Sequence, residues 1–225
     1  MFFDRIDYDR IPELSKKMKS IFTNGQTTST TAYLNWRFSS FFDIGTQFWQ
    51  MAEGYFETAN LLLNVCLEDN KDKKADIYIF PILFDIVHGT ELALKAINDY
   101  LYLILDDESK IEGNHNIKQL SDVSVKLLNK LKSNDSSEEI KDALVAINLV
   151  KKFIDNIYDK TDDMAFARYP ITNKDKEMFY ACSETNVTVD LMLLKEQLSY
   201  VATMLDFIMD LMMRYWDFVC DMKQE

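Results

Sequence analysis

The sequence predicts an all-α protein, a bundle of four to five long helices with a short irregular insert, and one possible hairpin, before the last helix. The 225 residues include only 5 Gly and 3 Pro, and the tight turns of sheets and barrels draw on both types. Apolar residues make up 48% of the chain, which is enough for one substantial core. They recur at helical spacing over several long segments. We therefore expect a single domain over residues 1–225.

A short helix and a polar loop are expected over residues 1–31, ahead of the bundle. Arg5–Phe22 carries a sparse apolar stripe that suits a short helix. Thr23–Thr31 is rich in threonine and contains a glycine, a composition typical of a loop or hinge. The helical bundle is then expected to occupy residues 38–225.

The first two helices of the bundle are predicted from dense apolar segments. Asp43–Glu68 is rich in Phe, Trp, Ala and Leu and ends at a charged run. Ile77–Leu105 forms the second, and Pro81 falls in its first turns, where a missing amide is tolerated. Because acidic, basic and imidazole side chains interrupt this second segment, we expect that it does not span a bilayer.

Two amphipathic helices follow a charged connection over Asp106–Asn114. We expect them at Asn116–Leu131 and Glu138–Ile157. Ser136 or Ser137 can cap the second of them, since a serine hydroxyl accepts a hydrogen bond from an unpaired amide at a helix start.

The insert and the last helix complete the predicted fold. Thr161–Thr188 loses helical periodicity and alternates at Met178–Ala181, which favours an irregular segment with one hairpin. Asp190–Met222 is predicted as a long final helix whose aspartates, Asp206, Asp210, Asp217 and Asp221, share one narrow arc. The rest of its circumference is apolar, so the helix is either central or in contact with a second chain. We expect a homodimer.

Charge and cysteine content exclude several classes of protein. The net charge is −12, and no basic patch with interleaved aromatic residues offsets it, so nonspecific nucleic-acid binding is not expected. No two of the three cysteines form a CxxC motif, so we expect free thiols. Free thiols are typical of a reducing compartment. The N-terminal residues lack the apolar run of a signal peptide. We therefore expect a cytoplasmic protein that does not associate with membranes.

A polar triplet on the second long helix is the first candidate site. His88, Glu91 and Lys95 share one face, and the order of Glu91 before Lys95 favours an ion pair. One interpretation is a buried network that fixes helix register, and the other is a ligand pocket. Arg168, followed by Tyr169 and Pro170, could lie in an exposed turn. It could instead fold back towards Glu91 and close such a pocket with a bidentate pair.

A metal site is a weaker alternative. Asp85 precedes His88, and Glu112 precedes His115, at the acid-x-x-His spacing used by carboxylate-bridged metal bundles. Gly113 interrupts the second pair, and further bridging glutamates are not evident, so we predict no metal. GxGxxG, P-loop, HExxH and GxSxG motifs are absent from the sequence, and no cofactor is predicted.

Four segments together resemble the HEPN superfamily over about residues 40–220. They are an alanine-rich helix at residues 52–63, the run from Phe80 to Lys95 that includes HGTELALK, the run NHNIKQL at residues 114–120, and Arg168-Tyr169-Pro170. The resemblance implies a four- to five-helix bundle that commonly dimerises. It also implies a role in toxin–antitoxin, phage-defence or nucleotide-linked systems, with a nucleotidyltransferase or another defence protein as partner.

Catalytic members of that family carry an Arg-x(4–6)-His motif, which this chain lacks. Upstream of His88 the allowed positions hold Pro81, Ile82 and Leu83. Upstream of His115 the one cation is Lys110, which does not reproduce the planar fork of arginine. We therefore expect a non-catalytic binding or partner module. The alternative is a divergent, metal-independent ribonuclease toxin that uses His115 with Lys110 or Arg168.

Overall fold

A computed structural model describes residues 16–23, 25–34, 42–108, 113, 115–172, 174 and 176–224. The chain divides into two units, Met1–Ser39 and Ser40–Glu225. In the first unit, residues 16–23 form turns and bends, so the predicted helix over Arg5–Phe22 is wrong in its described part. Its apolar residues are exposed there, and without a packed face a short amphipathic helix gains little. The threonine-rich stretch is a loop around a short 3-10 turn, η2 (Thr28–Thr30).

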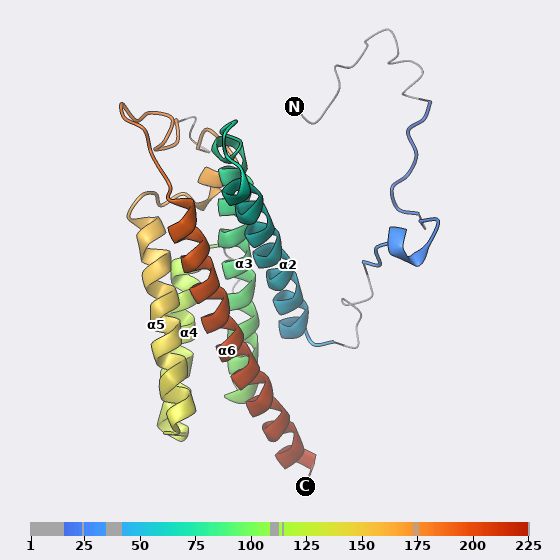
Figure 1. The fold of residues 1–225 in the computed structure, drawn as a ribbon. Coiled ribbons are helices and arrows are strands. Elements are labelled where there is room, and N and C mark those ends of the chain that lie inside the picture. Colours follow the sequence, from blue (N-terminus) through green and yellow to red (C-terminus); the bar gives the residue numbers. More distant parts are fainter. Residues whose placement is uncertain are drawn as a thin grey trace. The chain divides into compact units, whose positions relative to one another are not determined.

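The second unit is the predicted bundle of α-helices (Figure 1). Helix α2 spans Ile44–Glu68, and the carboxylate of Asp43 caps it by accepting from the Thr46 amide. Helix α3 spans Ala75–Ile104. Pro81 therefore lies in its second turn, deeper than predicted, where it cannot donate to the Ile77 carbonyl. The Ile77 residue is exposed, so this end of α3 lies at the surface.

The remaining α-helices of the described residues agree with the predicted segments to within a few positions. Helix α4 spans Ile117–Asn134 and helix α5 spans Glu138–Tyr158. The hydroxyl of Ser137, one of the two predicted caps, accepts from an amide in the first turn of α5. Helix α6 spans Leu191–Gln224, and all four aspartates of its predicted polar arc are exposed.

Helix α3 lies at the centre of the bundle, in contact with α2, α4 and α6. It is the one helix of the described residues that is long and apolar enough to cross a membrane, and 56% of its most apolar window is buried within the protein. Central helices of bundles have the same composition, because they are covered on most sides. The position of α3 therefore accounts for its apolarity.

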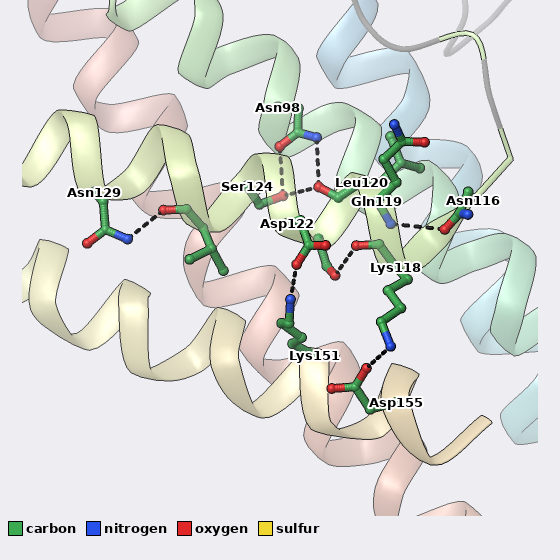
Figure 2. A network of polar contacts seen from close by, with 12 residues as sticks. Asn98, Asn116, Lys118, Gln119, Leu120, Asp122, Ser124, Asn129, Lys151 and Asp155 are labelled. Carbon is green, nitrogen blue, oxygen red and sulfur yellow. Dashed lines mark hydrogen bonds and ion pairs between the residues drawn. The ribbon is translucent and has the colours of Figure 1, made fainter. Parts of the chain in front are cut away.

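Polar contacts tie α4 to its two neighbours (Figure 2). On the α3 side, the fully buried Asn98 donates to the Leu120 carbonyl at 3.2 Å, and the Ser124 hydroxyl lies 2.7 Å from the Asn98 amide oxygen. On the α5 side, Lys118 pairs with Asp155 at 3.0 Å. The buried contacts fix the register of α3 against α4, whereas the half-exposed ion pair contributes little.

The insert between α5 and α6 contains a short 3-10 helix, η3 (Met164–Ala167). The predicted hairpin is reduced to a single antiparallel bridge between Ile171 and Glu177, and no strand forms among the described residues of the insert. Met178, from the alternating stretch, is buried in the core instead of continuing a ladder. The insert is thus anchored by side-chain packing, and η3 contacts α3.

Candidate functional site

The carboxylate of Glu91, in the middle of α3, is the hub of the candidate site. Its Oε1 accepts a hydrogen bond from Lys95 Nζ at 2.8 Å, one helical turn further along. His115, which lies just before α4, places Nδ1 at 2.9 Å from the same oxygen. His88 Nδ1 lies 3.7 Å from Oε2, which is an ion-pair distance but too long for a hydrogen bond.

Glu91 is held in its charged form. Burial by itself would raise the pKa of this carboxyl, but the contacts with His88, Lys95 and His115 together outweigh it and lower the pKa to about 2. Because an ionised carboxylate only accepts hydrogen bonds, Nδ1 of His115 must carry the hydrogen of their contact. The imidazole then leaves Nε2 for another partner.

Aromatic rings orient His88. The Phe84 ring, one turn earlier on α3, stacks on the imidazole with centroids 5.4 Å apart and planes inclined by 15°. Tyr55 of α2 meets the same imidazole edge-on at 4.7 Å. Helix α2 comes close to α3 here because Gly89 has no side chain, and a Cβ at this position would lie 2.9 Å from the Phe56 ring.

Arg168 enters the site from the end of η3. Its guanidinium carbon lies 5.8 Å from the centroid of Phe84 and 5.4 Å from that of Tyr169. Among the described residues Arg168 forms no ion pair, so the expected bidentate pair with Glu91 is not made. Lys95 and His115 bond to the carboxylate in its place. Tyr169 is itself exposed.

Some of these groups line a small pocket with a cavity volume of about 190 Å³, but Lys95 and Tyr169, two of the predicted site residues, do not. It is smaller than pockets that enclose drug-sized ligands, roughly 300–1,000 Å³. Apolar and polar side chains share its wall: Phe84, Val87, His88, Glu91, His115, Met164 and Arg168. The pocket therefore suits a small molecule, or one end of a larger one, that has both apolar and polar parts.

Two residues of the weaker sequence hypotheses lie outside the described residues. These are Lys110, the cation proposed to act with His115, and Glu112 of the second acid-x-x-His pair. Asp85 of the first pair is buried on α3, and that burial raises the pKa of its carboxyl while His88 opposes the rise. Among the described residues no group of three or more His, Cys, Asp and Glu could hold a metal ion.

Sequence reasoning missed the direct contact of His115 with Glu91 and the apolar part of the pocket wall. The two residues are 24 positions apart, and only the fold of the connection before α4 brings them together. The apolar part includes Phe84 and Val87, which precede His88 and Glu91 by one helical turn each and so lie on the same face of α3. No pattern in the sequence marks Met164.

Comparison with protein-family models gave no match. Searches of curated proteins and of solved structures likewise found no significant relative.

Proposed function

We propose that this chain is a non-catalytic, HEPN-like binding module whose binding site is the pocket around Glu91. One observation supports this most strongly: a buried, charged carboxylate lies 2.9 Å from His115 and 3.7 Å from His88, and all three side chains line one small cavity. The buried pair of Glu91 with Lys95 contributes to stability, but it does not account for the open pocket beside it. Here the His115 side chain is 79% exposed, and the pocket remains open beside it.

The binding role fits the wider proposal of a partner in a toxin–antitoxin, phage-defence or nucleotide-linked system. In such a role the module would act with a nucleotidyltransferase or another defence protein. Three features of the sequence support a role without catalysis: the missing Arg-x(4–6)-His motif, the acidic surface, and the absence of a hydrolase motif.

A second candidate function is metal-independent cleavage of RNA by His115 with Arg168. The observation that favours it is that both side chains line the same pocket, with Nε2 of His115 unused by the Glu91 contact. An imidazole and a guanidinium at one site are suited to proton transfer and to phosphate binding.

One experiment separates the two candidates. Purified protein is incubated with single-stranded RNA in the presence of EDTA, beside a His115→Ala variant. Under the binding proposal, neither protein cleaves RNA above the buffer blank, and small molecules that raise the melting temperature of the wild type lose that effect in His115→Ala. Cleavage by the wild type that disappears in His115→Ala would contradict a non-catalytic role.

A further inference from the structure

Arg168 is the one cationic side chain of the pocket wall that lacks an acidic partner within the described residues. Lys95, which does not line the pocket, already donates to Glu91. Arg168 is an exposed residue, so its guanidinium is open to solvent as well as to the cavity that it lines. Its contacts are with the faces of two aromatic rings, which leave the N–H groups of its fork available.

The rest of the wall indicates what kind of anion this guanidinium would meet. The apolar residues of the wall are Phe84, Val87 and Met164. The charged Glu91 lies in the same wall, but its carboxylate is paired with Lys95 and His115, which reduces its repulsion of an incoming anion. An inorganic anion prefers polar neighbours on every side, and burying it against these residues would cost free energy. A carboxylate on a small apolar body would place its two oxygens on the guanidinium fork and its body against the apolar residues.

Tyr180 sets the position of Arg168. Its hydroxyl lies 3.0 Å from the Phe166 carbonyl oxygen and 3.1 Å from that of Tyr169, so it binds the chain on both sides of the arginine. The Tyr180 ring packs edge-on against Phe80 of α3, with centroids 5.2 Å apart. The turn that carries Arg168 is thereby fastened to the helix that carries Glu91.

We propose that the pocket binds a small organic carboxylate with an apolar body, that Arg168 binds the carboxylate, and that Tyr180 is a positioning residue for Arg168. This inference rests on the proposed function, because it names the ligand class of the same site. The cavity of about 190 Å³ has room for an acid the size of a single substituted ring.

Three probes test the ligand class: benzoate, its uncharged analogue benzamide, and inorganic phosphate. Binding is followed by the resonances of the two histidine side chains during titration. We expect benzoate to shift both histidines saturably, and benzamide and phosphate to bind at least tenfold more weakly. Benzamide binding as tightly as benzoate would overturn the role of charge. Tighter phosphate binding would overturn the carboxylate class but leave a binding pocket in place.

Variants test the two residues. Arg168→Gln should reduce benzoate affinity at least tenfold, to the level of benzamide, because the neutral amide cannot form the charge-assisted pair. Arg214→Gln, an exposed arginine on α6, is the matched control and should change nothing. Tyr180→Phe keeps the ring but removes the hydroxyl. It should weaken benzoate binding several-fold and leave benzamide binding unchanged. The inference would be refuted by equal benzoate affinity in wild type and Arg168→Gln, or by no response to any probe. The proposed function is tested separately, by the RNA cleavage experiment.

Discussion

Glu91 is the residue on which the candidate site depends most. Replacing it with alanine leaves the Lys95 ammonium, whose side chain is 9% exposed, without its carboxylate. Breaking a buried pair in this way costs about 3–5 kcal/mol. We expect Glu91→Ala to lower the free energy of unfolding by that amount in urea denaturation.

Glu138→Ala is the matched control for that loss. Glu138 also pairs with a lysine, but its side chain is 82% exposed, and exposed pairs contribute about 0–1 kcal/mol. Equal, small losses in both variants would show that the Glu91 cluster does not stabilise the fold.

The pH dependence of stability gives a second test at this residue. The pKa of Glu91 is lowered in the folded protein to about 2, so its charged form stabilises the fold fully above the ordinary glutamate pKa, about 4.3. That contribution disappears as the pH falls through about 2. We expect the stability difference between wild type and Glu91→Gln, measured by urea denaturation, to shrink between about pH 4.5 and pH 2. A difference that stays constant over this range would contradict the lowered pKa.

At the scale of elements, two glycines should respond in opposite ways to alanine. Gly89 of α3 faces the Phe56 ring of α2, and the added Cβ would lie only 2.9 Å from it. Overpacking of this kind costs about 1–3 kcal/mol. Gly54 of α2 has nothing within 4 Å of an added Cβ, so alanine there should stabilise the helix by roughly 0.5–1 kcal/mol. Thermal unfolding of both variants checks the α2–α3 contact, and stabilisation by Gly89→Ala would contradict it.

The helices of the bundle and the irregular character of the insert were predictable from the sequence, whereas the hairpin in the insert was wrong. The starts of α2 and α5 follow from Asp43 and Ser137, whose side chains bond to amides two or three positions inside the helix. In the insert, Met178 lies in an alternating stretch, yet burial against the helices decides its place. The pairing of His115 with Glu91 could not be predicted from local patterns either, because the two residues are 24 positions apart in the sequence.

At the scale of the whole molecule, the homodimer stays a prediction. The burial of the α6 side chains indicates which of them would contact a second copy. Met212, in the middle of α6, is completely buried, so part of the apolar circumference is used inside the bundle. Phe218 and Met222 remain exposed towards the C-terminal end, which extends beyond the neighbouring helices in Figure 1. These two side chains are the natural contacts for a second copy.

Light scattering at tens of micromolar, a range that detects moderate interfaces, tests the dimer. We expect a dimer for the wild type and a monomer for Phe218→Asp combined with Met222→Glu. Val145→Glu, at an exposed apolar position on α5, is the control and should remain dimeric. A strictly monomeric wild type would refute the prediction.

The central claim, that Glu91 gathers both histidines of the chain into one pocket, is tested most directly by nitrogen-15 spectra of the two imidazoles. At a pH where the rings are uncharged, we expect His115 to be protonated on Nδ1, because that atom donates to Glu91 at 2.9 Å. Glu91→Gln should move the resonances of both rings, whereas Glu138→Gln should move neither. The claim would be contradicted if His115 were protonated on Nε2 and the resonances of both rings were unchanged in Glu91→Gln.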